Sequence, residues 1–576
     1  MQMTQYDIFS MELKRTALLS LAKHIPLEIL QSIHINIHRN HAFEPIQSVI
    51  APFLHYAGLK AHFHYSDYDD SLSFSSLASQ SHNADLEIIY IDKTRYNLDN
   101  VAFMQFLKER SLALRTLTKA PIMIALLDDS TFATLLESQY AHDIQSLQNQ
   151  HIFCFSLYAL YTQREQFITL ESHHLIDEAK ESISGTRLSN YGSLAIAQIL
   201  GLKLIPALTL PTLKAIVCDL DNTLYGGILG EDGINSLQFT PSHIALQKQL
   251  LEYKKQGFLL ALCSKNESQD AMNLFATRKD FPLSWNDFDN TQVNWKPKYE
   301  NLLNIAQSFN IGVDSLLFID DNIAEIESIK HIGAKYIHAL SPQNVLWKLF
   351  LFPQMTKLHT NKEDSLRAND IAANTQRKNL QSLDTETYFE NLAITLSFSL
   401  NNTQHTQRIY ELMNKTNQFI ASYTRPTLPQ AQEWLDSKHF CVLSIAMSDR
   451  LSDSGIIGII IGEYKEAQKE IHIIDIVVSC RALGRRLETL MLNYAFYLIT
   501  ENLSPSIKDS KKRESTSHSV FLHYQKGERN APFLQTLSQL AHLSKEHYTH
   551  LQPMSAQTIS IPITKPDMQG LHIHLT

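Results

Sequence analysis

Short apolar runs alternate with longer helix-compatible stretches over residues 1–208. The runs that predict buried strands lie at residues 16–20, 60–65, 86–91, 121–126 and 151–155. Strands that are apolar on both faces and separated by helices are typical of a parallel sheet in an α/β layer. We therefore expect an α/β domain over residues 1–208, with Pro206 and Pro211 marking its end.

A second series of the same kind follows over residues 209–355. A strand at 214–218 is followed by carboxylates, and further strands are predicted at 258–264, 315–320 and 334–338, with helices between them. This alternation predicts a doubly wound, Rossmann-like sheet, which binds ligands at the carboxyl ends of its strands. The polar residues of greatest chemical interest lie at such ends.

The last part of the chain has a different pattern. Residues 356–385 are polar, contain neither Gly nor Pro, and predict a connecting helix. Residues 386–576 begin with strands at 393–400, 440–447, 455–464 and 471–478, followed by a helix from about 483. Hairpin-like strands that precede a helix predict an α+β domain, here with a C-terminal extension.

Composition narrows the class of protein. A chain of 576 residues exceeds one ordinary core, so about three domains are expected. The formal net charge of −9 argues against a nucleic-acid binder. The apolar runs are too short to span a bilayer and the N-terminus has no apolar signal-peptide core, so we expect no membrane insertion and a cytoplasmic location. The cysteines are scattered and indicate no disulfide framework.

The strongest chemical signal is the pair Asp219 and Asp221, directly after the strand at 214–218. Alternation along an extended chain puts both carboxylates on the same side. Two neighbouring carboxylates repel each other unless a cation neutralises them, and Mg²⁺ prefers carboxylate and phosphate oxygens. We therefore expect both residues in a magnesium site, with Asp219 as the nucleophile on phosphorus and Asp221 as the general acid and base.

Further candidate residues for phosphoryl transfer follow later in the sequence. The hydroxyls of Thr223 and Ser264, together with Asn266, are expected to bind the phosphate. A lysine can hold the nucleophile and neutralise developing charge, and Lys298 is favoured over Lys296 by its spacing to the next helix. Asp320, with Asp321 beside it, ends a strand and is expected to supply outer metal carboxylates.

The segments DLDNT, CSKN, WKPK and FIDDN, in this order, resemble the four motifs of the haloacid-dehalogenase (HAD) superfamily. The longer string DLDNTLYGGILGEDG resembles the FkbH-like branch, capless HAD proteins of polyketide and surface-glycan pathways, and the similarity continues in KTNQF (415–419) and SCRALGR (479–485). This resemblance implies the roles just given to Asp219, Asp221 and Asp320. Tyr225 stands where the family usually has Trp.

The intervals between these motifs leave no room for a lid domain. The chain from Thr223 to Ser264 accommodates a hairpin and one helix, and the interval from Ser264 to Lys298 accommodates little more. An uncovered site cannot exclude water by closing on a small substrate. It either hydrolyses its substrate or uses a larger partner as its lid, which favours a carrier-bound or macromolecular substrate.

Residues 388–500 resemble the acyl-CoA N-acyltransferase (GNAT) fold. Arg481, Gly484 and Arg485 follow a strand and can form an anion site for a carrier or CoA pyrophosphate, although Arg486 occupies the last small position of the usual pattern. The alternative is a helix N-terminus whose arginines pair with acids. Cys480 at this helix start can act as an acyl-accepting nucleophile, or it is a buried strand-end cysteine.

The domain at 1–208 is either flavodoxin-like or SGNH-hydrolase-like, and the family resemblance implies the second. An active SGNH site needs Gly-Asp-Ser after the first strand, but the predicted strand ends at Ser20 without it. We interpret this domain as structural or carrier-docking. The whole chain is predicted to be an enzyme that acts on a phosphorylated small acid and transfers its acyl group to an acyl carrier protein. The alternatives are a simple phosphatase with partner-binding outer domains and a non-enzymatic assembly module.

Overall fold

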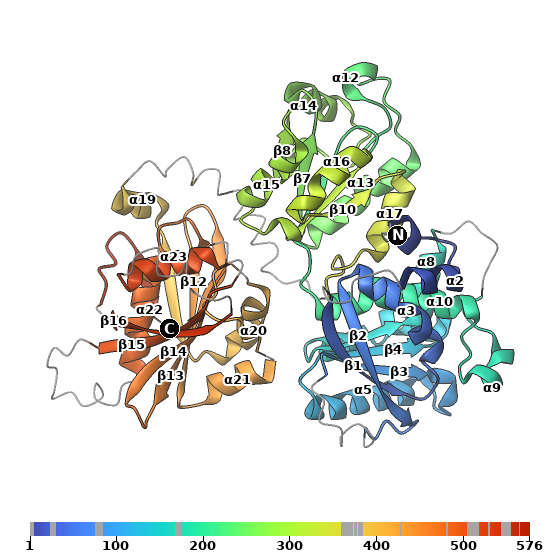
Figure 1. Cartoon of the computed structure of the whole chain (residues 1–576), viewed down its shortest axis with the longest axis horizontal. Helices are drawn as coiled ribbons and strands as arrows, with labels where there is room; N and C mark the ends of the chain where they lie inside the picture. Colours follow the sequence, from blue (N-terminus) through green and yellow to red (C-terminus); the bar gives the residue numbers. More distant parts are fainter. Residues whose placement is uncertain are drawn as a thin grey trace. The chain divides into compact units, whose positions relative to one another are not determined.

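The computed structural model describes residues 5–22, 30–74, 84–167, 174–358, 373, 377, 384–416, 418–426, 428–479, 482–503, 518–527, 530–542, 554–563 and 565–575. The chain divides into two compact units, of which the first comprises residues 1–302 and 313–360 and the second the remainder. Three sheets organise the described residues (Figure 1). The expected mixture of α and β structure with parallel sheets is confirmed.

The first sheet has the strand order β2-β1-β3-β4-β5, and all of its pairs are parallel. Its strands are β1 (Gln31–Arg39), β2 (Leu59–Tyr68), β3 (Leu86–Asp92), β4 (Ile122–Leu127) and β5 (Ile152–Ser156). Successive residues of β3 enter different cores, since Ile88 and Tyr90 pack with α3 (Glu44–Tyr56) while Ile89 and Ile91 pack with α5 (Asn100–Leu117). Helices therefore cover both faces, as the apolar runs predict. Further helices described in this domain are α1 (Gln5–Ile8), α6 (Ser130–Glu137), α7 (Ala141–Gln148), α8 (Leu157–Glu165), α9 (Glu181–Ser184), α10 (Asn190–Gln198) and α11 (Ile205–Thr209).

The prediction of a strand at residues 16–20 is wrong, because helix α2 (Arg15–Ala22) lies there. Ala and Leu favour helix, and of residues 15–21 only Leu18 is buried, whereas a central strand needs both faces covered. The first strand is β1, in which Ile33, Ile35 and Ile37 alternate with polar residues. It ends at Arg39 rather than at a serine.

The second sheet has the order β10-β9-β6-β7-β8 and is also parallel. Its strands are β6 (Ala215–Cys218), β7 (Leu259–Ser264), β8 (Asn290–Val293), β9 (Leu316–Asp320) and β10 (Lys335–His338). The chain reverses direction across the sheet at β6, so the carboxyl end of this central strand is the switch point where such sheets bind ligands. The helices are α12 (Leu229–Asp232), α13 (Pro241–Lys255), α14 (Ser268–Thr277), α15 (Lys298–Ser308), α16 (Ile323–Ile329) and α17 (Pro342–Leu351).

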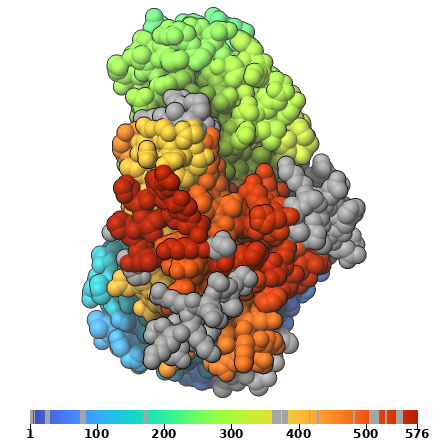
Figure 2. Space-filling model, turned by 90° about the vertical axis from the view of Figure 1, so that its left-hand side faces the viewer, coloured from blue at the N-terminus to red at the C-terminus, as the bar shows by residue number. Residues whose placement is uncertain are grey.

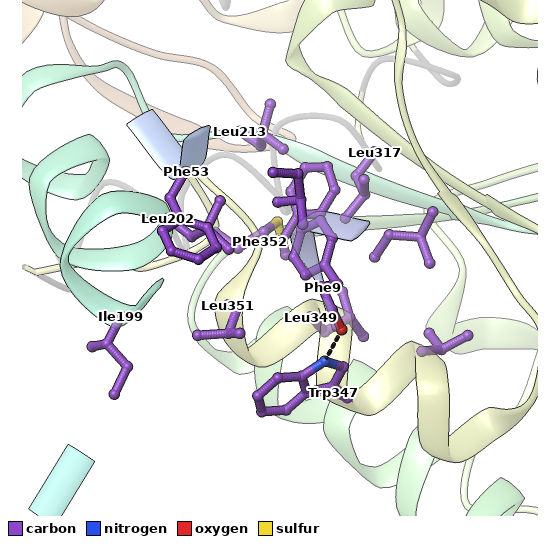
Figure 3. Close-up of a cluster of buried hydrophobic side chains, with 14 of the residues drawn as sticks. Phe9, Phe53, Ile199, Leu202, Leu213, Leu317, Trp347, Leu349, Leu351 and Phe352 are labelled. Atoms are coloured by element: carbon purple, nitrogen blue, oxygen red, sulfur yellow. Dashed lines mark hydrogen bonds between the residues drawn. The ribbon is translucent and has the colours of Figure 1, made fainter. Parts of the chain in front are cut away.

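One hydrophobic core joins the first two sheets within the first unit (Figure 3). The N-terminal segment and α17 meet in it: the indole of Trp347 donates to the carbonyl of Phe9 at 2.7 Å, and the rings of Phe9 and Phe352 stack with centroids 6.0 Å apart. The side chain of Gln5 adds polar contacts, donating to Tyr56 Oη at 3.0 Å and accepting from the backbone N–H of His338 at 3.2 Å. The two sheets are thus packed as one body.

One helical stretch, Asn190–Thr209, is long and apolar enough to cross a membrane, with 78% of its apolar window buried inside the protein. It consists of α10, the π-helical η4 (Ile199–Leu204) and α11. Gly201 lies against α3 so closely that a Cβ there would be 2.7 Å from the Cβ of Phe53. This packing is that of a core helix.

The second unit contains a mixed sheet with the order β16-β15-β14-β13-β12-β11-β17. Its elements are α19 (Thr385–Leu392), β11 (Thr395–Leu400), α20 (Thr406–Lys415), α21 (Leu428–Asp436), β12 (Phe440–Ser448), β13 (Asp453–Lys465), β14 (Glu470–Val478), α22 (Glu488–Leu503), β15 (His518–Gln525), α23 (Ala531–Leu540), β16 (Ala556–Ile563) and β17 (His572–Leu575). The four predicted strands are confirmed, whereas β15 to β17 lie in the region expected only as an extension. Their residues, orange-red to red in Figure 2, are visible on the surface. Most of the predicted helix at 356–385 lies outside the described residues.

The parallel ladder between β14 and β15 is short, running from Ile471 to Ile473 on β14. Beyond it, the segment 419–421 bonds to both strands: the N–H of Val478 donates to the carbonyl of Phe419, and the N–H of Gln525 donates to that of Ala421. Ala421 also donates to the carbonyl of Ile476. The segment 419–421 of the same chain therefore occupies the hydrogen-bonding edge at the end of β14.

Candidate active site

The carboxyl ends of β6, β7 and β9 bring three predicted site residues to one edge of the second sheet. Asp219 directly follows β6, Ser264 ends β7 and Asp320 ends β9. The backbone N–H of Asp219 donates to the carbonyl of Ile319 at 2.9 Å, which extends the β6–β9 ladder by one residue. All three side chains are buried, so the site lies at the end of the sheet core rather than on an exposed loop.

Lys298, the first residue of α15, lies between two of these carboxylates. Its Nζ is 3.0 Å from Oδ2 of Asp219 and 2.6 Å from Oδ2 of Asp320, and its side chain is buried. Burial opposes the charged form of Lys298, but the two carboxylates outweigh burial and raise the lysine pKa above its usual value. The exposed Lys296 makes a backbone hydrogen bond to Asn294, so Lys298 is the lysine that reaches the carboxylates.

A group of three carboxylates at this edge can hold a metal ion. One oxygen each from Asp219, Asp320 and Asp321 lie within 4.8 Å of one another. Burial raises the pKa of Asp219 to about 6, against the opposing effect of Lys298, and burial also raises the pKa values of Asp320 and Asp321. Ionised carboxylates are costly to bury in such a group without further positive charge, so the set is suited to a divalent cation.

The donor set also identifies the kind of cation. Oδ1 of Asp219 is buried and has no hydrogen-bond partner among the described residues, so the protein does not use all the acceptor sites of this carboxylate. Mg²⁺ is bound in proteins by a few carboxylates plus phosphate oxygens and water. An all-oxygen site at the switch point of a parallel sheet therefore fits Mg²⁺, which Asp219, Asp320 and Asp321 could hold.

Asp221 has a different environment from the metal group. Its Oδ1 accepts from the Tyr225 hydroxyl at 2.7 Å and from the backbone N–H of Leu229 at 2.9 Å, and its Oδ2 accepts from Nδ2 of Asn266 at 2.9 Å. The side chain of Asp221 is not part of the three-carboxylate group. Its place among the metal ligands stays a prediction. Its contact with Tyr225 could have been suspected from the four-residue spacing within one loop.

Two loops carry the other predicted phosphate-binding residues. Thr223 lies in the turn after Asp219, and its buried Oγ1 has no partner among the described residues. Asn266 lies in the loop after β7, where its Nδ2 donates to the Ser264 hydroxyl at 3.2 Å as well as to Asp221. These hydroxyl and amide groups are of the kind that bind phosphoryl oxygens, and their role as phosphate ligands stays a prediction.

The described residues 209–355 contain no separate lid domain over this edge. Between Thr223 and Ser264 the chain forms α12 and α13, and between Ser264 and Lys298 it forms α14, the short η5 (Trp285–Asp287) and β8. Several large apolar side chains stay exposed in the segments that follow the strands; these are Ile228, Trp295, Leu340 and, at the start of α16, Ile323. The described part of this domain therefore has no insertion large enough to act as a lid.

The candidate acyl-transfer residues are only partly described. Cys480 and Arg481 lie outside the described residues. Gly484 has a positive φ of 78° and its N–H donates to Glu488 at 2.6 Å, at the start of α22. Arg485 is buried and bonds to Asp449 Oδ2 at 3.0 Å. Arg485 is therefore paired with an acid, as in the alternative interpretation of this helix start.

Asp449 is a residue that sequence reasoning missed. Its carboxylate also accepts from Arg377, at 2.8 Å, so two arginines share one buried acid, and the combined effect of those partners outweighs burial and lowers the Asp449 pKa. A lone Asp in the connection between β12 and β13 gives no sequence signal for such a network, because its partners come from distant parts of the chain.

The equivalent edge of the first sheet is filled by its own chain. Arg187 forms a bidentate ion pair with the buried Asp92 at the end of β3, at 2.8 and 2.9 Å, and His41 after β1 bonds to Thr186 at 2.9 Å. Burial lowers the pKa of His41 to about 3, so this imidazole is neutral. The residues following β1 contain no Gly-Asp-Ser, and the structural or docking role of this domain stays a prediction.

No protein-family model matches the chain, and no curated protein matches it significantly. Among solved structures, the N-terminal part of a Bacteroides fragilis protein, containing a phosphatase domain complexed with Mg, shares 18% identity over 60% of this chain and 100% of that one, with a TM-score of 0.47. A HAD-family enzyme from Bacteroides thetaiotaomicron, complexed with magnesium and inorganic phosphate, shares 15% identity over 37% of this chain and 91% of that one, with a TM-score of 0.16.

Proposed function

We propose that this chain is a magnesium-dependent phosphatase or phosphotransferase of the HAD type, working through an aspartyl-phosphate on Asp219. The observation that carries the proposal is the setting of Asp219, whose Oδ2 is held by Lys298 while its buried Oδ1 has no partner among the described residues. A nucleophile needs one oxygen fixed and one free to attack. The four motifs that resemble the HAD superfamily meet at this point.

The side chains suggest the following sequence of steps. Oδ1 of Asp219 attacks phosphorus and the bond from phosphorus to the leaving oxygen breaks, while Asp221 gives its proton to that oxygen. Asp221 then takes a proton from water, which attacks the aspartyl-phosphate, releases phosphate and restores Asp219. Lys298 offsets negative charge on Asp219 throughout. Mg²⁺, when bound by the three aspartates, supplies the further positive charge that phosphoryl oxygens need.

A direct test uses the purified chain with a panel of phosphomonoesters and acyl phosphates. Phosphate release that requires Mg²⁺, is abolished by a chelator, and is lost in Asp219→Asn supports the proposal. Trapping of acid-stable, hydroxylamine-sensitive label from a ³²P-substrate on the wild type, but not on the variant, identifies the aspartyl-phosphate. Release that persists unchanged in Asp219→Asn contradicts it.

We also propose a finer assignment, in which the substrate is a phosphorylated small acid and its acyl group passes to an acyl carrier protein in the cytoplasm. Two features support this assignment: the lack of a lid domain in the described residues 209–355 and the resemblance of residues 479–485 to the FkbH-like family. Arg481, Gly484 and Arg485 would contact the carrier arm, and Cys480 would hold the acyl group.

Two observations favour the simpler candidate, a phosphatase whose outer domains bind partners. Arg485 is already paired with Asp449, and the segment 419–421 pairs with the end of β14. Incubation with Mg²⁺, 1,3-bisphosphoglycerate and holo acyl carrier proteins distinguishes acyl transfer from simple phosphatase activity, with phosphate release and carrier mass both measured. A glyceryl mass on the carrier that is lost in Asp219→Asn and in Cys480→Ala supports acyl transfer. Phosphate release without any carrier adduct supports the simpler phosphatase.

A further inference from the structure

Asp221, the proposed general acid, is held by a hydrogen bond from the side chain of Tyr225. The Tyr225 hydroxyl is 2.7 Å from Oδ1 of Asp221, and the ring is fully buried, stacked on Phe281 with centroids 6.1 Å apart. Burial, followed by the neighbouring carboxylate, raises the pKa of the Tyr225 hydroxyl, so it keeps its proton and acts as the donor. A tyrosine anchored by its ring offers its hydroxyl at a fixed position.

The donors around Asp221 make its two oxygens unequal. Oδ1 accepts two hydrogen bonds, from Tyr225 and from the backbone N–H of Leu229. Oδ2 accepts one, from Asn266. A carboxylate oxygen has about two lone-pair sites, so Oδ1 is fully engaged and only Oδ2 retains a site for a proton. The proton that Asp221 gives and takes back must therefore be carried on Oδ2.

We infer that Tyr225 is a positioning residue for the general acid: it occupies Oδ1 of Asp221 and so directs the proton-carrying Oδ2 toward the leaving group. This inference rests on the proposed function. Without the tyrosine hydroxyl, Oδ1 has only the Leu229 N–H, so the carboxyl group can rotate and the proton can reside on either oxygen. Removing this hydroxyl is then expected to slow the step in which the leaving oxygen is protonated.

Leaving groups of different basicity isolate that step. An alkyl phosphate expels an alkoxide that needs a proton, whereas p-nitrophenyl phosphate expels a stable phenolate that does not. Because kcat/KM reports the steps up to formation of the aspartyl-phosphate, it excludes the later attack by water. General acids contribute about 10²–10⁴-fold, so mispositioning one in Tyr225→Phe is expected to lower kcat/KM for the alkyl ester roughly 10–100-fold. For the aryl ester, kcat/KM is expected to fall less than about 3-fold, because its leaving group does not need the proton.

Two further variants complete the experiment. Tyr253→Phe removes another buried tyrosine hydroxyl of the same domain, which donates to the carbonyl of Leu349 at 3.1 Å, and is expected to leave the ratio of the two esters unchanged. Tyr225→Trp restores an N–H donor and is expected to recover part of the alkyl-ester activity. Thermal unfolding of every variant reports whether it folds.

An equal loss on both esters in Tyr225→Phe, or no loss on either, overturns the positioning role while leaving the phosphatase proposal intact. A wild-type protein that hydrolyses neither ester under any magnesium concentration overturns both. A selective loss on the alkyl ester, partly recovered by Tyr225→Trp, supports the role.

Discussion

The Nζ of Lys298 lies 3.0 Å from Oδ2 of Asp219, and both side chains are buried at the end of the second sheet. The same amine is 2.6 Å from Asp320, so one cation balances two acids where burial alone disfavours every charge. This arrangement links the stability of the first unit to the chemistry of its site.

Lys298→Met is expected to lower the free energy of unfolding of the first unit by about 3–5 kcal/mol in magnesium-free buffer, because it leaves two buried carboxylates without their partner. Added Mg²⁺ is expected to recover part of this loss but none of the phosphatase activity. Urea unfolding with and without Mg²⁺ measures the effect. The exposed Lys296→Met is the control, and a comparable loss in that variant contradicts the assignment.

Asp475 in the second unit predicts a pH dependence of stability. Burial raises its pKa to about 7, while Ser422 donates to both carboxylate oxygens, at 3.1 and 2.8 Å. The folded state therefore holds the proton more tightly than the unfolded state. Its stabilising contribution is full below about pH 4 and is lost as the pH rises to about 7, at up to about 1.4 kcal/mol per pH unit.

Asp475→Asn removes the titration; its amide oxygen can still accept from the Ser422 N–H, and its amide nitrogen can donate to the Ser422 hydroxyl. Denaturant unfolding from pH 4 to pH 8 is expected to show wild-type stability falling relative to the variant over this window. The exposed Asp436→Asn serves as the matched control. Parallel profiles for the wild type and Asp475→Asn would show that the carboxyl does not titrate as described.

Close packing at Gly201 gives a prediction for the core helix. A Cβ there would meet Phe53 at 2.7 Å and Ile50 at 3.1 Å, so Gly201→Ala is expected to cost about 1–3 kcal/mol through overpacking. At Gly230 a Cβ would have nothing within 4 Å, and Gly230→Ala is expected to change stability by less than about 0.5 kcal/mol. Equal thermal midpoints for the two variants would argue against the close approach of the helices.

The contact between Trp347 and Phe9 predicts that the first two sheets unfold together. Trp347→Phe removes the 2.7 Å hydrogen bond to the Phe9 carbonyl and leaves a cavity, at an expected cost of about 1–3 kcal/mol. Hydrogen exchange is expected to accelerate in β1 and β6 alike. Acceleration confined to one of the two sheets would indicate that they are energetically independent. Trp295→Phe, at a tryptophan that is 67% exposed, is the control.

Sequence patterns predict those parts of the structure that depend on local chemistry. The apolar run before Asp219 predicts β6, and the order of the four motifs predicts that Asp219, Ser264 and Asp320 meet at one sheet edge. The strand expected at 16–20 is wrong because an apolar run of Ala and Leu satisfies a helix equally well. The alternation of Ile33, Ile35 and Ile37 indicates β1, but the histidines between them obscure it.

Other features depend on contacts between distant parts of the chain. Neither the shared core at Trp347 and Phe9 nor the network around Asp449 has a local signature, because each partner alone has an ordinary context. The hydrogen bond from Tyr225 to Asp221 could be predicted only in part. Both residues lie in one loop, but the backbone conformation of that loop decides whether their side chains meet.

The pairing of segment 419–421 with the end of β14 has a consequence for any carrier arm. An amide-bearing ligand that bonded to this edge would have to replace hydrogen bonds that the protein already makes, so it could bind only the fraction of molecules in which the segment has moved away. Its apparent affinity is the intrinsic affinity reduced by that fraction, about tenfold for each 1.4 kcal/mol of opening free energy. Substitutions that weaken the segment should then tighten carrier binding even though they touch no carrier atom.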